Sequence, residues 1–218
     1  MLLSFTHHFF GWLNMKRFYT LVLSLFTVLL LQGCDQVTLQ PVSKTGTILA
    51  FGDSLTYGVG VEEENSYPAV LANLTNREVI NGGISGEVTK DGLARFSEEL
   101  DEAQPELVIL LEGGNDILRS HNLKHTKQNL AQMIQLAQGR GIQVVLIGVP
   151  EKKLFSSVAK FYPELAEEYN LVFADNLVSS LLRSPELKSD YIHFNEMGYR
   201  KMAHAIYDLL VEHNGIAL

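Results

Sequence analysis

The stretch AFGDSLTYG, Ala50–Gly58, joins an apolar run to a set of small and polar residues. The run TILAF, Thr47–Phe51, is apolar enough to form a strand that is buried on both faces. The residues that follow favour a tight turn, which would place Ser54 directly beyond the end of this strand. In open α/β sheets, ligands bind outside the carboxyl ends of the strands. Ser54 therefore occupies a position where such a fold places functional groups.

Four more short apolar runs follow, and helical patterns separate them. We expect strands at 78–81, 106–111, 142–147 and 171–174. An apolar stripe with helical spacing lies between the third and fourth of the five strands, and a second one lies near the end of the chain. These stripes are formed by Leu130, Met133, Ile134 and Ala137, and by Met202, Ile206, Leu209 and Leu210. Alternating strands and helices predict an α/β fold, a three-layer α/β/α sandwich around a five-stranded parallel sheet.

Composition limits the class of protein. The chain has 218 residues, of which 46% are hydrophobic and 19% charged, so it can bury one good-sized core. We expect one monomeric domain at 47–218. The formal net charge of −8, without a long basic run, argues against a nucleic-acid partner, whose phosphates need a basic face.

The first 33 residues have the pattern of a signal peptide. Lys16 and Arg17 precede Phe18–Leu31, a stretch without any charge. This stretch is shorter than the roughly 20 residues of a spanning helix, although a membrane-spanning anchor is the alternative interpretation. Met15 directly precedes the basic pair, so both Met1 and Met15 are compatible with the start of such a leader.

The sequence around Cys34 resembles a bacterial lipoprotein signal. In such proteins a peptidase cuts before the cysteine, and the thiol receives a diacylglyceryl group. Residues 34–46 would then form a lipidated tether to the membrane, and Asp35 resembles the signal that keeps such lipoproteins in the inner membrane. The expected location is the bacterial cell envelope, on the inner membrane and facing the periplasm. A buried structural cysteine is the alternative for Cys34.

Polar segments follow other expected strands and precede the last helix. They are Asn81–Thr89, Glu112–Asp116 and Asp190–Asn195. Because the carboxyl ends of parallel strands meet at one edge of a sheet, we expect these segments to lie near Ser54. A serine hydroxyl needs a base within hydrogen-bond reach and a third group that orients this base. His193 is the expected base and Asp190 the expected orienting group; the alternatives are a helix cap for each of Ser54 and Asp190 and a surface histidine.

Four short blocks together resemble the SGNH or GDSL hydrolase family. They are GDSL at Gly52–Leu55, a glycine-rich loop with Gly86, GGND at Gly113–Asp116 and DxxH at Asp190–His193. Their order and spacing are most similar to the branch of bacterial thioesterase I, lysophospholipase L1 and arylesterases, and nearly the whole domain takes part. The family's flavodoxin-like sheet agrees with the expected sandwich. Phe194 replaces the proline that usually follows the histidine, which removes no catalytic atom.

The resemblance implies an oxyanion hole and a reaction. Its donors would be the backbone N–H groups of Ser54 and Gly86 and the side-chain amide of Asn115. The implied activity is that of a serine esterase that hydrolyses carboxylic esters or thioesters of small or flexible acyl groups, without a cofactor. The chain has no long insertion that could form a lid, and we expect the acyl group to lie along Gly148–Ser157.

Two other functions remain open at this point. A carbohydrate O-acetyl esterase would use the same groups, and a catalytically silent, membrane-tethered module would only bind its ligand. His121 and His125 are four residues apart but lack the glutamate of an HExxH helix, so we expect a solvated helix face and no metal.

Overall fold

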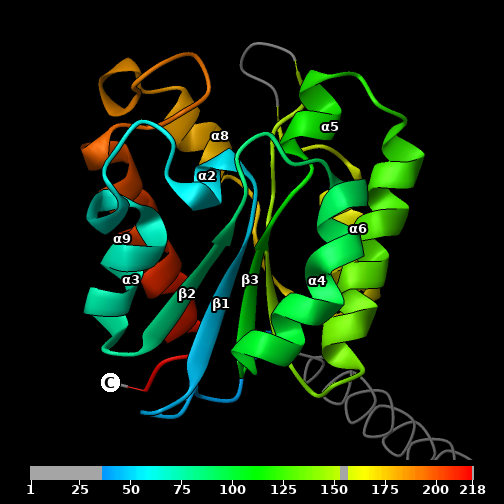
Figure 1. Ribbon diagram of the computed structural model, residues 1–218, viewed down its shortest axis with the longest axis vertical. Helices are drawn as coiled ribbons and strands as arrows, with labels where there is room; N and C mark the ends of the chain where they lie inside the picture. Colours follow the sequence, from blue (N-terminus) through cyan, green and yellow to red (C-terminus); the bar gives the residue numbers. More distant parts are fainter. Residues whose placement is uncertain (1–35, 153–156, 218) are drawn as a thin grey trace, which may run out of the picture. The chain divides into compact units, whose positions relative to one another are not determined.

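The structure is a computed structural model that describes residues 36–152 and 157–217 (Figure 1). Its compact unit begins at Val37, and its sheet has five parallel strands in the order β2-β1-β3-β4-β5. The strands are β1 (Thr47–Gly52), β2 (Glu78–Gly83), β3 (Leu107–Leu111), β4 (Gln143–Ile147) and β5 (Val172–Ala174). The predicted five-stranded parallel sheet is confirmed, and each strand begins and ends within two residues of its expected bounds.

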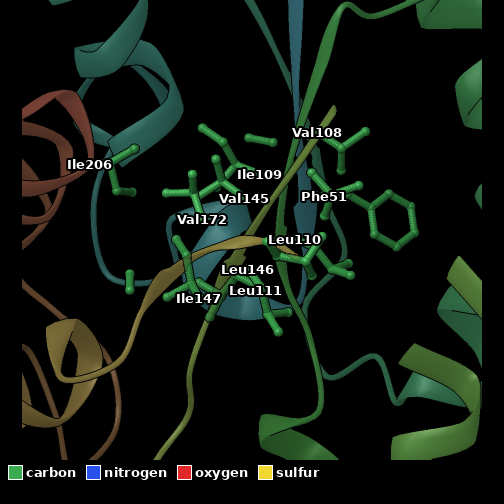
Figure 2. Close-up of a cluster of buried hydrophobic side chains, with 14 of the residues drawn as sticks. Phe51, Val108, Ile109, Leu110, Leu111, Val145, Leu146, Ile147, Val172 and Ile206 are labelled. Atoms are coloured by element: carbon green, nitrogen blue, oxygen red, sulfur yellow. The ribbon is translucent and has the colours of Figure 1, made fainter. Parts of the chain in front are cut away.

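The middle strands are buried on both faces, as their unbroken apolar sequence requires. All residues of β3 are closed to solvent, and so are Val145–Ile147 of β4. Figure 2 shows their side chains clustered with those of Phe51 and Val172 from neighbouring strands and Ile206 from the last helix. Each fully buried aliphatic side chain stabilises the fold by about 1.5–3 kcal/mol. This cluster therefore fixes the positions of the strand ends.

Helices cover both faces of the sheet and complete the three predicted layers (Figure 1). On one face α3 packs against α9, with α8 beside it, and on the other face α4 and α7 pack against α6. Their bounds are α3 (Tyr67–Thr75), α4 (Thr89–Ala103), α6 (Leu123–Gln138), α7 (Phe161–Glu168), α8 (Leu177–Leu182) and α9 (Glu196–Glu212), with short 3-10 helices at Glu63–Asn65 (η1) and Pro185–Leu187 (η2). The expected stripe of α6 is buried throughout, whereas Leu209 in that of α9 is only half-buried.

Two short helices begin where strands end. Helix α2 (Ser54–Tyr57) follows β1, and α5 (Gly114–Leu118) follows β3 (Figure 1). Strands β1 and β3 are neighbours although β2 lies between them in the sequence, so the chain first moves outward from β1 and then crosses to its other side. Ligands bind at such a switch point in open α/β sheets.

Residues 37–46 pack on the domain, which differs from the expected tether. Leu39 and Val42 are buried, and their backbone N–H groups donate to the carbonyls of His213 and Gly215 beyond α9. Buried apolar side chains and backbone hydrogen bonds thus hold this largely polar segment on the domain. Cys34, Asp35 and the expected leader lie outside the described residues. In the part of the chain that the structure describes, no helix has the length and apolar character to cross a membrane.

We predict that Leu39→Ala lowers the free energy of unfolding by about 2–3 kcal/mol, because it leaves a cavity in the core. Chemical denaturation of the purified domain measures this change. Thr38→Ala, next to it on the exposed side, is the matched control and should have little effect. Equal stability of the two variants would mean that residues 37–46 do not belong to the folded domain.

Candidate active site

Ser54 lies at the first residue of α2, in a turn that depends on close packing at the end of β1. A Cβ atom on Gly52 would lie 2.2 Å from the carbonyl oxygen of Leu111 on β3, so only glycine fits there. Asp53 caps α2, because its Oδ1 accepts a hydrogen bond from the backbone N–H of Leu55 at 3.0 Å. The turn thus holds the serine hydroxyl beside the end of β3.

The structure brings Ser54, His193 and Asp190 into one row. Nε2 of His193 lies 2.9 Å from Oγ of Ser54, and Nδ1 lies 2.7 Å from Oδ2 of Asp190. An ionised carboxylate only accepts hydrogen bonds, so Nδ1 carries the ring proton and Nε2 of the neutral ring accepts from the serine. This arrangement can take the proton from the hydroxyl as the oxygen attacks an electrophile.

The segment before α9 builds the histidine and aspartate pair locally. Oδ1 of Asp190 accepts from the backbone N–H groups of Ile192 and His193, both at 2.8 Å. Desolvation raises the pKa of Asp190, but the hydrogen bonds from the His193 ring and from these two N–H groups outweigh it and lower the pKa to about 2. Asp190 is therefore ionised at neutral pH and can stabilise a protonated His193.

Asn115 lines the same cavity as Ser54, and Gly86 lies in the loop after β2 to which Asn115 and Arg119 donate hydrogen bonds. Asn115 is on α5, and its Nδ2 donates to the carbonyl of Glu87 at 2.8 Å and lies 3.5 Å from Oδ2 of Asp53. Gly86 has a φ of +79°, a conformation that favours glycine. The two hydrogens of Nδ2 thus point to the carbonyl of Glu87 and, through the longer and weaker contact, to Asp53 beside Ser54.

A group of buried carboxylates lies behind the site. Burial is the largest cause that raises the pKa of Asp53 to about 6 and that of Glu112 well above its ordinary value, and in Glu112 the charge of Asp53 adds to it. Oε2 of Glu112 accepts from the backbone N–H of Gly113, while Oε1 has no hydrogen-bond partner within the described residues. The carboxylate of Glu87 forms a salt bridge with Arg95, in which Oε2 lies 2.6 Å from Nη2. Burial in this low-dielectric region therefore disfavours the charged form of Glu112.

A cavity of about 400 Å³ opens beside Ser54. Its buried wall is mainly apolar and comes from α5, the loop after β4 and α8, and its exposed rim carries Lys152, Arg183 and Tyr191. The lining includes Val149–Lys152 of the loop that we expected to hold an acyl group, while 153–156 of this loop lie outside the described residues. This cavity can take an apolar chain that ends at the serine.

Two residues near the site were not found from the sequence. Glu112 was interpreted only as the start of the GGND segment. Arg119 follows Asn115 by four residues, and its Nη2 donates to the carbonyl of Gly86 at 2.8 Å. The spacing of four residues on a helical turn is the signal that could have indicated Arg119. Asp116 accepts hydrogen bonds from the backbone and the side chain of Thr89.

The fold and this arrangement define a hydrolase of the α/β class with a serine at a strand end. Residues 50–201 match the model of the GDSL-like Lipase/Acylhydrolase family. The chain belongs to this family, and it is an enzyme that hydrolyses ester bonds.

Individual relatives agree with this assignment. The chain is 33% identical over 177 residues to an arylesterase of Vibrio mimicus, and the alignment covers 76% of this chain and 88% of that one. It is 30% identical over 157 residues to thioesterase 1/protease 1/lysophospholipase L1 of Escherichia coli (strain K12), covering 68% of this chain and 76% of that one. A protein of Bacillus subtilis called uncharacterized lipoprotein YqeF is 29% identical over 147 residues, covering 61% of this chain and 56% of that one.

A solved structure shows the same fold. The psychrotrophic esterase EstA from Pseudoalteromonas sp. superposes with a TM-score of 0.71 at 21% identity, covering 77% of this chain and 97% of that one. At this identity the likeness concerns the arrangement of strands and helices, which agrees with the flavodoxin-like sandwich of the SGNH hydrolases.

We predict that Asp190→Asn lowers kcat by about 10³- to 10⁴-fold while the protein stays folded. The amide oxygen can still accept from the two backbone N–H groups, so the local turn persists, but an NH₂ group then faces Nδ1 of His193 and holds the wrong tautomer. Steady-state kinetics with an activated ester measure the loss, and circular dichroism checks the fold. A kcat within tenfold of the wild-type value would contradict this role of Asp190.

In the wild type, loss of activity between pH 7 and pH 3 should not come from Asp190, since its pKa is about 2.

Proposed function

We propose that the protein is a monomeric serine esterase that uses Ser54 as nucleophile, His193 as general base and Asp190 to orient the histidine. The observation that supports this most is the continuous row of hydrogen bonds, 2.9 Å from Oγ of Ser54 to Nε2 and 2.7 Å from Nδ1 to Asp190. Asp190 and His193 lie on one turn, whereas the serine is 139 residues away from the histidine and is brought to it by the fold. A helix cap alone explains neither contact.

The reaction proceeds in two halves. His193 takes the proton of Ser54 as Oγ attacks the carbonyl carbon, and the negative charge develops on the carbonyl oxygen. The backbone N–H groups of Ser54 and Gly86 and the amide of Asn115 donate to this oxygen. As the tetrahedral intermediate collapses, His193 gives its proton to the leaving alcohol or thiol. Water then attacks the acyl-enzyme by the same steps and releases the acid.

The substrates are carboxylic esters or thioesters with an apolar, flexible acyl group. The cavity supports this class, because its volume of about 400 Å³ and its apolar wall suit a chain longer than acetate. The names of the relatives, an arylesterase and a thioesterase with lysophospholipase activity, point in the same direction. The cavity thus disfavours a carbohydrate O-acetyl esterase, which would bind acetate and a polar sugar. The row of hydrogen bonds disfavours a silent binding module.

We predict that a fluorophosphonate probe labels Ser54 and that Ser54→Ala abolishes the label and lowers ester turnover by several orders of magnitude. Thr56→Ala lies in the same short helix and is a control for labelling. A panel of p-nitrophenyl esters of increasing acyl length, run beside acyl-CoA and lysophospholipid, measures the substrate class. Turnover of the acetyl ester alone would favour the O-acetyl esterase, and an unlabelled wild type would favour a binding module.

The same enzyme would be a lipoprotein of the bacterial cell envelope, anchored through Cys34 in the inner membrane and facing the periplasm. The basic and apolar leader before Cys34 supports the anchor, and Asp35 supports retention in the inner membrane. One bacterial relative is itself called a lipoprotein. Because the compact unit begins at Val37, the free part of the tether would be only a few residues long.

We predict that Cys34→Ser stops processing by the lipoprotein route and leaves a larger precursor. Metabolic labelling with a fatty acid and mass spectrometry of the membrane-bound protein measure the modification. Asp35→Ser should move the mature protein to the outer membrane if the host sorts lipoproteins by this residue. An unmodified Cys34 in the mature membrane fraction would contradict lipidation.

A further inference from the structure

Helix α5 holds the loop of Gly86 with two side chains from one helical turn. Asn115 and Arg119 are four residues apart, and the backbone N–H of Arg119 donates to the carbonyl of Asn115 at 3.0 Å. The Asn115 amide donates to the carbonyl of Glu87, and the Arg119 guanidinium donates to the carbonyl of Gly86, each at 2.8 Å. Two consecutive carbonyls of the loop are thus bound from the same side.

The central residue of the loop, Gly86, has no side chain of its own, and the backbone N–H of Glu87 closes the turn around it by donating to the carbonyl of Ile84 at 3.2 Å. Gly86 can adopt more backbone conformations than any other residue type, and rotation about its two bonds changes the direction of its N–H group. On one side the loop is held where the backbone N–H of Ile84 donates to Gly52, and on the other the Glu87 side chain is paired with Arg95. The side chain of Arg119 hydrogen-bonds the backbone of Gly86 itself.

We propose that Arg119 is a positioning residue that fixes the carbonyl of Gly86 and thereby aims the N–H group of Gly86 at the oxyanion. This inference rests on the proposed function, in which that N–H group is an oxyanion donor. Arg119 does not line the cavity beside Ser54, although its neighbour Leu118 does. Its effect on catalysis therefore passes through Gly86, and it does not require contact with the acyl group.

The position of Arg119 predicts a specific kinetic signature. The contact to Gly86 is exposed, so its loss should change the melting temperature little. A misdirected donor, in contrast, weakens the transition state, in which the oxygen is charged, more than it weakens substrate binding. Displacement of a catalytic group by about 1 Å can cost about 10²-fold in rate. Loss of Arg119 should thus appear in kcat and leave KM nearly unchanged.

The test compares Arg119→Met, Arg119→Lys and Arg200→Met on a neutral p-nitrophenyl ester and on an anionic one. Methionine keeps much of the stem of arginine but has no donor, and lysine keeps one donor and the charge. Arg200 is an exposed arginine on α9, so its substitution controls for the loss of one positive charge. We expect Arg119→Met to lower kcat roughly 10- to 100-fold, Arg119→Lys to recover part of this loss, and Arg200→Met to behave like the wild type.

Each kcat is divided by the amount of serine that a neutral fluorophosphonate labels. In Arg119→Met the rate of labelling should fall together with kcat, because phosphonylation also places a charged oxygen in the oxyanion hole. Repeating the assay at higher salt should leave the ratio of Arg119→Met to wild type unchanged, since a hydrogen bond that sets geometry is not screened as a distant charge is.

Three outcomes would overturn the proposal. Unchanged kcat with a lower melting temperature would make Arg119 purely structural. Unchanged kcat with a higher KM for anionic esters only would make it a substrate-binding residue. If Arg200→Met lowered kcat as much as Arg119→Met, the effect of Arg119 would come from the net charge of the protein and not from its contact with Gly86. An unlabelled wild type would refute the proposed function itself, and this result is separate from all three.

Discussion

The parallel pairing of β1 with β3 places two turns of the site at the same edge of the sheet. Gly52 at the end of β1 lies opposite Leu111 at the end of β3, so α2 and α5 begin next to each other. Ser54 and Asn115 reach the same cavity for this reason, although 61 positions separate them. The buried side chains of β3 and β4 hold this register, and a slip of one residue would turn every side chain to the other face.

Charge is distributed unevenly around the site. In front, Asp190 is ionised and exposed to solvent, and its Oδ2 lies 2.7 Å from Nδ1 of His193. Behind, Glu112 and Asp53 lie in a region of low dielectric, where their pKa values rise because the charged forms are poorly solvated. Carboxyl groups with opposite pKa shifts thus lie on the two sides of one serine. The charged form is favoured at Asp190 and disfavoured at Glu112 and Asp53.

The sequence was sufficient where local patterns determine the structure. The strands were found because parallel strands have unbroken apolar sequences. The contact between Asp190 and His193 could be expected because the two residues are only three positions apart. Glu112 and Arg119 were missed because their roles depend on contacts across the fold, such as the hydrogen bond between Arg119 and Gly86 over 33 residues. Residues 37–46 look like a tether because most of them are polar. Their packing depends on the end of α9, which no local pattern indicates.

The path by which the chain enters the domain decides which side of the enzyme stays free. Gln40 and Ser43 hydrogen-bond the side chains of Gln143 and Glu106, at the starts of β4 and β3. Ser54 follows the other end of β1, and six residues of extended strand span about 20 Å. Whatever is joined ahead of Val37, whether an anchor, a fusion partner or a solid support, is therefore attached at the edge opposite the cavity. Immobilisation through this end should leave the mouth of the cavity open to substrates that arrive from solution.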